Sequence, residues 1–221
     1  KTACRAIKAA GYATDPQYAD KLIRLIESYG LTAFDGAGQA VTGGVSNTTA
    51  GAESPADAKG DGKMKASEFI EKLQDIVDHY KTLYVMGCFG APLTGGNVSR
   101  YCTNHSYNKE AARTAMIKAA PVYGFDCVCL IKGVLWGWCG DASKTYGGAS
   151  YASGGVPDIG ADTMITKCSG LSTDFSRIVP GEAVWLKGHI GVYIGGGKVI
   201  ECSPAFKNCV QVTACLNIGA I

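Results

Sequence analysis

The chain has 221 residues, of which 47% are hydrophobic and 18% are charged, with a formal net charge of +2 at pH 7. This composition is typical of a globular protein of one or two domains with enough apolar side chains for a sizeable core. The small net charge and the dispersed Lys and Arg residues argue against a nucleic-acid partner. No apolar stretch approaches the roughly 18 residues needed to span a bilayer, so we expect no membrane insertion.

The N-terminal part of the chain contains a predicted helix followed by a predicted linker. Residues 14–30 begin with a capping aspartate and a proline, carry apolar side chains at helical spacing and end at a glycine. Residues 36–62 are dominated by small and polar side chains, which predicts a flexible linker. We therefore expect a helical segment at residues 1–35, a linker at 36–64 and a separate domain at 65–221.

Helical patterns come first in the domain expected at residues 65–221. Ser67 is placed to cap a helix whose apolar face carries Phe69, Leu73 and Ile76. The sequence then predicts a short strand at residues 83–87 and a loop at 90–107. Two further helices are predicted at residues 109–120 and 127–135. The last of these helices is nearly apolar throughout, so we expect it to be buried.

Strand patterns take over after Glu182. Four short runs of β-branched and aromatic residues predict strands at residues 183–186, 189–194, 198–202 and 209–213. Helices that precede strands along the chain favour an α+β fold, in which helices pack on an antiparallel β-sheet.

Cys127 stands where a reactive thiol is expected. Asp126 is a good N-cap residue, which places Cys127 at the first helical position. The partial positive charge at a helix N-terminus stabilises a thiolate, and the unpaired N–H groups there can hold an oxyanion. Cys129 lies about 200° further around the same helix, so the two thiols cannot face one cleft.

His189 and Glu201 are expected to meet across a hairpin. If residues 195–197 form a three-glycine loop, the two side chains share one face as diagonal neighbours, with Cα atoms about 7–8 Å apart. A carboxylate there can hold the imidazole in one tautomer, whereas a two-residue loop would turn Glu201 to the other face. Gly188 and Gly191 are expected to leave room for a substrate backbone.

Ordinary structural roles remain as alternatives for each of these residues. The chain has ten cysteines, most of which we expect to be buried or free thiols, and the sequence leaves any pairing open. A zinc site is a further alternative, with the ligands drawn from Cys127, Cys129, Cys139, Cys168 and His189. Their spacing contains no Cys-x-x-Cys pair, so we expect neither a metal nor another cofactor.

Three motifs in this order resemble the NlpC/P60 family of cysteine peptidases. Asp126-Cys127 and the segments at residues 180–185 and 188–195 are similar to that family's Asp-Cys-Ser-Gly-Leu-Val, Pro-Gly-Asp-Leu-Val-Phe and His-Val-Gly-Ile-Tyr-Ile-Gly patterns. Residues 84–87 resemble the Tyr-Val-Trp-Gly segment ahead of the nucleophile. The match runs from about residue 65 to 215 and is closest to cell-wall lytic enzymes of phages and prophages of Gram-positive bacteria.

The resemblance implies a papain-like fold and hydrolysis of amide bonds in the stem peptides of bacterial peptidoglycan. It implies Cys127 as the nucleophile, His189 as the base and Glu201 as the orienting third residue. The candidate substrate contacts are Tyr84, Asp126, His105 and Trp185, although a loop histidine without a role is the alternative for His105. The chain departs from the family pattern at Val128-Cys129 and at Glu201, where the family often has histidine.

A second, shorter resemblance concerns the N-terminal segment. Residues 9–22 resemble the closing part of bacterial endo-β-N-acetylglucosaminidase domains, which implies a truncated two-enzyme wall hydrolase without glycosidase activity of its own. We expect such an endolysin or autolysin to act at the bacterial cell wall, after secretion or phage lysis, although no signal peptide is visible. A catalytically inactive wall-binding domain and an acyl transferase on the same fold are the alternatives. The sequence is silent on oligomeric state.

Overall fold

The computed structural model of the protein describes residues 23, 64–119 and 122–219. The chain divides into two units, Lys1–Ala50 and Gly51–Ile221, and every described residue except Ile23 belongs to the second. The predictions for the helical segment at 1–35 and the linker at 36–64 therefore lie outside the described residues, apart from Ile23, which is helical, and Met64.

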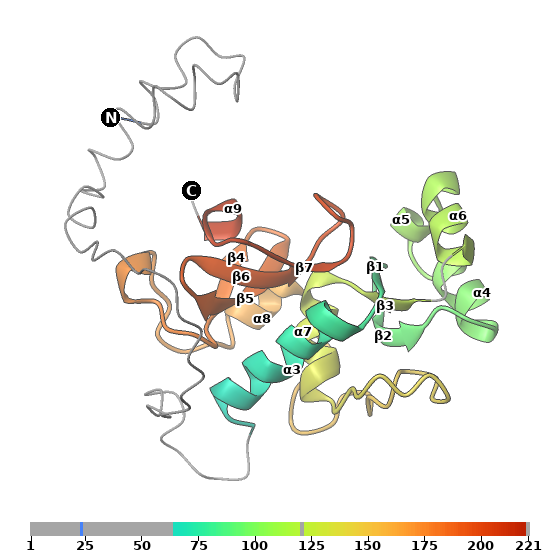
Figure 1. Ribbon diagram of the computed structural model, residues 1–221, viewed down its shortest axis with the longest axis horizontal. Helices are drawn as coiled ribbons and strands as arrows, with labels where there is room; N and C mark the ends of the chain where they lie inside the picture. The colour runs from blue at the N-terminus through green and yellow to red at the C-terminus, as the bar shows by residue number, and fades with distance from the viewer. Residues whose placement is uncertain (1–22, 24–63, 120–121, 220–221) are drawn as a thin grey trace, which may run out of the picture. The chain divides into compact units, whose positions relative to one another are not determined.

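Helix α7 (Cys127–Leu135) is the central element of the second unit. Every residue from Cys127 to Val134 is buried, as its apolar sequence predicts. The helix packs against β2 (Phe89–Pro92) on one side and against β5 (His189–Gly195) and β6 (Lys198–Cys202) on the other. Figure 1 shows α7 between the larger and the smaller sheet to which these strands belong.

The larger sheet has four antiparallel strands in the order β4-β5-β6-β7, where β4 is Ala183–Leu186 and β7 is Val210–Ala214. The strand predictions for this part of the chain are confirmed to within one residue at each end. Ile190 and Ile200 pack in the core that contains α7, whereas Val184 and Val199 pack with Ile218 of α9 (Leu216–Gly219).

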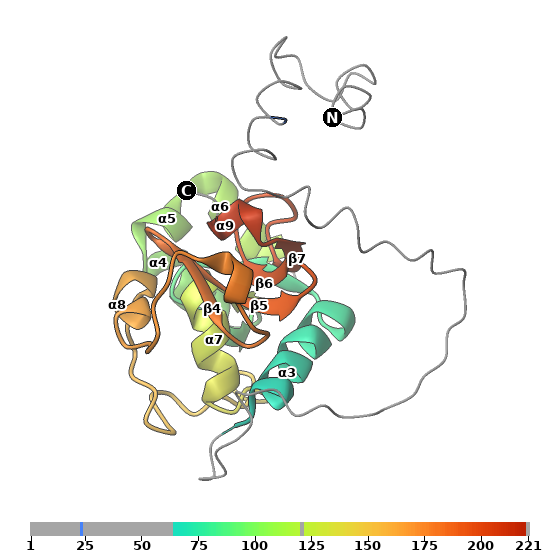
Figure 2. The ribbon, with the colours of Figure 1, turned by 90° about the vertical axis from the view of Figure 1, so that its left-hand side faces the viewer.

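Two helices flank these layers. Helix α3 (Ala66–His79) buries Phe69, Leu73 and Ile76, the apolar face that its sequence predicts, and contacts α7 and β7. The short helix α8 (Ala161–Ile165) lies beside β4, and Figure 2 shows it across α7 from α3. The expected cap is wrong, because Lys65 is the N-cap residue of α3 and Ser67 lies inside the helix.

The smaller sheet contains β1 (Thr82–Tyr84), β2 and β3 (Tyr123–Phe125) in the order β1-β3-β2. Strands β1 and β3 are parallel and β2 is antiparallel to β3, so the expectation of an antiparallel sheet holds only for the larger sheet. The structure thus has the α+β class, with helices packed on sheets. Strand β3 was not predicted, because three residues are too few to show an alternating pattern.

The loop predicted at residues 90–107 is wrong. This segment contains the end of β2, helix α4 (Gly96–Thr103) and the start of α5 (Ser106–Lys109), which α6 (Ala111–Ala119) follows. Helix α4 starts after Gly95 without a side-chain cap, so its sequence carries no start signal. The α4–α6 helices build their own small core, which contains Leu93, Tyr101, Cys102 and Ile117, at the far side of the smaller sheet (Figure 1).

A search of the described residues finds no helix that is both long and apolar enough to cross a bilayer. A short 3-10 helix, η3 (Phe175–Arg177), precedes the larger sheet along the chain.

The packing of α3 generates a stability prediction. Leu73 is fully buried, so Leu73→Ala should lower the free energy of unfolding by about 2–4 kcal/mol, through lost apolar burial and a residual cavity. The exposed Glu71 on the same helix provides the control, and Glu71→Ala should change it by no more than about 0.5 kcal/mol. Urea denaturation followed by circular dichroism measures both, and equal midpoints for the two variants would contradict the packing of α3.

Candidate active site

Asp126 fixes the start of α7. One carboxylate oxygen accepts a hydrogen bond from the backbone N–H of Cys129 at 2.7 Å, as an N-cap residue does. The other oxygen accepts the backbone N–H of Gly87 at 2.7 Å and so ties the β1–β2 connection to the helix. The cap was predicted, and it places Cys127 at the first residue of α7. The bond to Gly87 was not predicted.

Cys127 and His189 meet at this helix end. The Cys127 side chain forms a hydrogen bond with the imidazole of His189, and the cysteine is only 6% exposed. Nε2 of His189 lies 2.6 Å from Oε2 of Glu201. With Nε2 engaged by Glu201, Nδ1 is the ring nitrogen that remains for the thiol. Three residues far apart in the sequence thus form one hydrogen-bonded chain.

Glu201 is buried but fully partnered. Its Oε2 contacts His189, and its Oε1 accepts a hydrogen bond from the hydroxyl of Thr213 on β7. Glu201 is 3% exposed, so this second bond matters, because an unpaired buried carboxylate is costly. Thr213 was missed at the sequence level. It lies two residues beyond Gln211, the partner of Glu201 on β7, so only the β6–β7 register identifies it.

The turn between β5 and β6 differs from the expected one but leads to the expected register. Val192 pairs with Ile200, the register in which position 191 lies opposite Glu201. At the turn, however, Gly195 pairs with Lys198, so the loop has two residues and an irregularity follows Tyr193. The extra residue of this β-bulge compensates for the shorter loop, and Glu201 keeps the face that points to His189.

The pKa of His189 is raised from 6.5 to about 9. Burial is the largest influence and acts to lower the pKa, because it disfavours the imidazolium. The hydrogen bonds and charges of Cys127 and Glu201 together outweigh it. The site therefore favours a protonated His189 over most of the physiological pH range, which is the form that pairs with a thiolate.

Other buried cysteines near α7 are poor nucleophiles. Burial raises the pKa of Cys129 and Cys202 well above the ordinary range, and that of Cys88 to about 12. All nine cysteines in the described part of the chain are free. Cys127 differs from these three in its imidazole partner, which makes it the candidate nucleophile.

Tyr84 borders the site and is held by Arg113, a residue that the sequence analysis did not single out. Burial, and then the charges of Cys127 and Asp126, raise the pKa of Tyr84, so its phenol stays neutral. Arg113 donates a 2.5 Å hydrogen bond to the carbonyl of Tyr84 and a 2.9 Å bond to Asn208. A buried arginine in helix α6 thus joins the α4–α6 helices to the edge of the site.

His105 packs against Gly87, the residue whose backbone N–H binds Asp126. It precedes α5 as its N-cap residue and is exposed to solvent. A Cβ atom on Gly87 would lie 2.2 Å from Nε2 of His105, so the imidazole packs directly on that glycine. Gly87 also has a φ of +76°, a backbone conformation that would be strained in a residue with a side chain. A substrate contact at His105 stays a prediction.

Trp185 is anchored beside the hairpin that carries His189. Its indole N–H donates to Asp162 of α8 at 2.9 Å, and the ring is 37% exposed. Asp162 also accepts the backbone N–H of Gly188 at 2.6 Å. Asp162, which sequence reasoning missed, therefore steadies the residue next to His189. Hydrogen bonds from Gly188 and Trp185 lower the pKa of its carboxyl.

The expected role of Gly191 is wrong. A Cβ atom there would lie 2.5 Å from Cγ1 of Val199 and 3.0 Å from Cδ1 of Ile218. The space in front of Gly191 is thus filled by core side chains and offers no room for a substrate. At Gly188, by contrast, an added Cβ would meet nothing within 4 Å.

The zinc-site alternative gains no support from the arrangement of the described side chains. Within residues 23, 64–119 and 122–219, no group of three or more His, Cys, Asp or Glu side chains is arranged to hold a metal ion. Comparison with protein-family models, with curated proteins and with solved structures gives no match to this chain. What the site can do therefore follows from its own residues.

The Cys127–His189–Glu201 chain generates a titration prediction. His189 should titrate near pH 9, and Glu201→Gln should lower that pKa, because the lost negative charge no longer favours the imidazolium. Since the folded pKa lies above 6.5, the protonated His189 stabilises the fold fully below that pH, and this contribution is lost as pH rises through about 9.

An NMR titration of the imidazole resonances measures this pKa in both proteins. The chain has three histidines, so His189→Gln assigns the signal and the other two serve as internal references. An equal or higher midpoint in Glu201→Gln would contradict the pairing.

Proposed function

We propose that the chain is a cysteine peptidase of the NlpC/P60 type that hydrolyses amide bonds in the stem peptides of bacterial peptidoglycan. The observation that carries the proposal is the hydrogen-bonded chain from Cys127 through His189 to Glu201 at the N-terminus of α7. A nucleophile, a base and a group that orients the base are the parts of a covalent amide hydrolase.

The geometry supports a thiolate as the attacking group. His189 takes the thiol proton of Cys127 through Nδ1, while Glu201 holds Nε2 and stabilises the positive charge of the ring. The thiolate sulfur attacks the amide carbonyl, and the carbonyl oxygen becomes an oxyanion. The N-terminal end of α7 is electropositive and favours both anions.

The first turn of α7 supplies the donors for that oxyanion. Asp126 takes the N–H of Cys129, and the Asp126 carbonyl takes the N–H of Leu130. The N–H of Cys127 forms no hydrogen bond within the described part of the chain and is available, as the oxyanion requires. Collapse of the intermediate breaks the C–N bond, and His189 gives its proton to the leaving amine.

Water completes the cycle. With its proton gone, His189 accepts a proton from a water molecule, whose oxygen attacks the thioester carbonyl. The C–S bond breaks, the carboxylic acid leaves and His189 returns its proton to the sulfur of Cys127. An amine in place of water would give acyl transfer, so the acyl transferase alternative shares every residue of this mechanism.

The substrate class rests on the motifs, and the architecture supports it. A helix that carries the nucleophile packs on an antiparallel sheet that carries the base, which is the arrangement expected of a papain-like fold. The Asp-Cys and Gly-His segments that resemble NlpC/P60 peptidases are the ones that meet here. A wall hydrolase of the endolysin or autolysin kind, acting at the cell wall, fits this combination.

Digestion of purified Gram-positive peptidoglycan tests the proposal. New peptide ends, read by mass spectrometry, should appear with the parent protein, and Cys127→Ala should reduce their rate of formation by at least about a thousandfold. The control is Cys129→Ala, which removes a buried thiol on the same helix. It should keep turnover wherever the protein remains folded by circular dichroism.

Two results would contradict the assignment. Undiminished release by Cys127→Ala would exclude Cys127 as the nucleophile. Absence of release by the parent protein from several wall chemotypes, together with no labelling of Cys127 by iodoacetamide, would favour the wall-binding alternative.

A further inference from the structure

A groove of about 310 Å³ opens beside the candidate active site and has no part in the mechanism above. Its lining comes from the β1–β2 connection, the first residue of β2, α4 with its C-cap, and the segment after α7. The residues are Gly87, Phe89, Arg100, Tyr101, Asn104, Tyr146 and Tyr151. Arg100, Tyr101 and Asn104 come from the segment for which the sequence predicted a loop.

One backbone hydrogen bond connects the groove to the start of α7. Gly87, which lines the groove, donates its N–H to Asp126, and Asp126 directly precedes Cys127. The groove is thus one hydrogen bond away from the residue that precedes the candidate nucleophile. The position makes the groove a candidate subsite for the part of the substrate next to the bond that is cut.

One charged side chain lines the groove. Arg100 donates a hydrogen bond from Nη1 to the hydroxyl of Tyr146 at 2.8 Å, and its guanidinium carbon lies 5.4 Å from the centroid of that ring. These contacts orient the guanidinium. Arg100 forms no ion pair with any described residue, so its remaining donors are available to a ligand.

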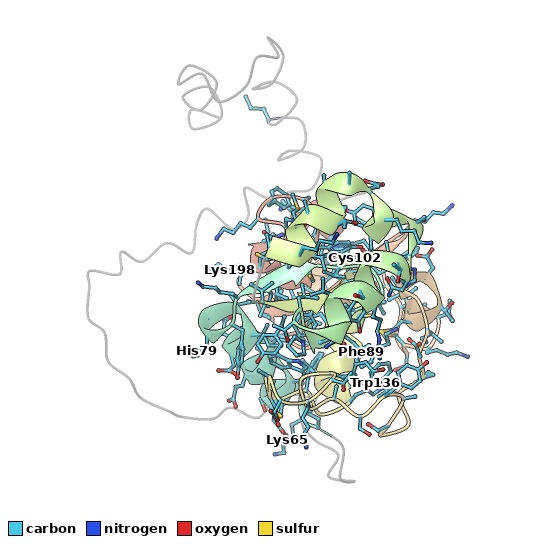
Figure 3. All side chains as sticks on the ribbon, turned by 90° about the vertical axis from the view of Figure 1, so that its right-hand side faces the viewer. Lys65, His79, Phe89, Cys102, Trp136 and Lys198 are labelled. Carbon is cyan, nitrogen blue, oxygen red and sulfur yellow. The ribbon has the colours of Figure 1, made fainter. Side chains whose placement is uncertain are left out.

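The other walls are aromatic. The ring of Phe89 lies 4.6 Å from that of Tyr146 and 5.8 Å from that of Tyr151, between centroids. Figure 3 labels Phe89 close to Trp136, whose ring centroid is 5.1 Å away, so this side of the groove is firmly packed. Tyr151 is 57% exposed and forms the open edge.

The carboxylate that contacts Tyr151 at the edge of the groove already has two partners. Asp158 accepts the hydroxyl of Tyr151 at 2.7 Å through one oxygen and pairs with Lys132 through the other. The buried ammonium of Lys132 thus compensates the charge of Asp158. The groove combines an oriented, unpaired cation with flat aromatic walls, which suits a planar carboxylate on a short peptide.

We propose that this groove is a substrate subsite in which Arg100 binds a free carboxylate of the stem peptide, while Phe89, Tyr146 and Tyr151 contact the adjoining peptide. The inference rests on the proposed function and adds a specificity to it. Peptides whose corresponding carboxyl group is amidated should bind more weakly, because a neutral carboxamide lacks the charge that the guanidinium recognises.

A set of synthetic stem peptides tests the subsite, in which each carboxylate in turn is replaced by a carboxamide. Binding is measured by calorimetry with the Cys127→Ala protein, so that no turnover interferes. Amidation at one position should weaken binding by about tenfold, as expected when a charge-assisted hydrogen bond is lost. In cleavage assays with the parent protein, the same amidation should raise KM more than it lowers kcat.

Variants identify the residue responsible, each made in the Cys127→Ala protein for the binding measurement. Arg100→Gln should weaken binding of the free peptide about tenfold and abolish its discrimination against the amidated one. Arg100→Lys should keep part of the discrimination between the free and the amidated peptide, because the charge remains without the forked geometry of the guanidinium. Arg177→Gln is the control, since Arg177 is also exposed but lies on η3 outside the groove, and it should discriminate like the parent.

The outcomes separate the two proposals. If Arg100→Gln discriminates as the parent does, or if no carboxylate affects binding, the subsite proposal is wrong while the proposed function stands. If the parent protein cleaves no peptide but Arg100-dependent binding persists, the proposed hydrolysis fails and the subsite survives as a carboxylate site. If the peptides are neither bound nor cleaved, both are wrong.

Discussion

The candidate site depends first on the carboxylate of Asp126. Its two oxygens accept hydrogen bonds from the backbone N–H groups of Cys129 and Gly87, one in α7 and one in the β1–β2 connection. An uncompensated negative charge beside Cys127 would oppose a thiolate, but here much of it is engaged by backbone donors. The same two bonds fix the helix start against the smaller sheet, so the candidate nucleophile, the sheet and the groove share one anchor. Gly87 has to be glycine for this, since His105 occupies the space of a side chain.

The second constraint is the pairing of β5, β6 and β7. His189, Glu201 and Thr213 lie on three adjacent strands and are joined by side-chain hydrogen bonds. A shift of one residue in either pairing would move Glu201 or its partner to the opposite face. The bulge after Tyr193 is therefore part of the site, although it lies at the far end of the hairpin from His189.

Sequence reasoning succeeded where the pattern is long or capped and failed where the structure is short or set by distant contacts. Helix α7 and the larger sheet follow from an N-cap and from β-rich runs, and the His189–Glu201 contact follows from hairpin register. Strand β3 has three residues, and its parallel partner β1 lies about forty residues earlier, so neither local propensity nor a turn indicates the pair. Asp162 and Arg113 form hydrogen bonds with Gly188 and Tyr84, which are distant in the sequence, so no local pattern predicts these contacts.

The α4–α6 helices show that elements with weak sequence signals can contribute to the candidate site. They lie in the chain between two strands of the smaller sheet, and a buried arginine connects them to the site through the carbonyl of Tyr84 and the side chain of Asn208. Asn208 belongs to the β6–β7 connection, so Arg113 links the helices to both sheets. Helix α4, which carries Arg100, contacts α6 and is connected to the site through it. The candidate catalytic residues lie in the elements whose sequence is easiest to interpret, whereas the proposed subsite is built largely from elements whose sequence says least about their structure.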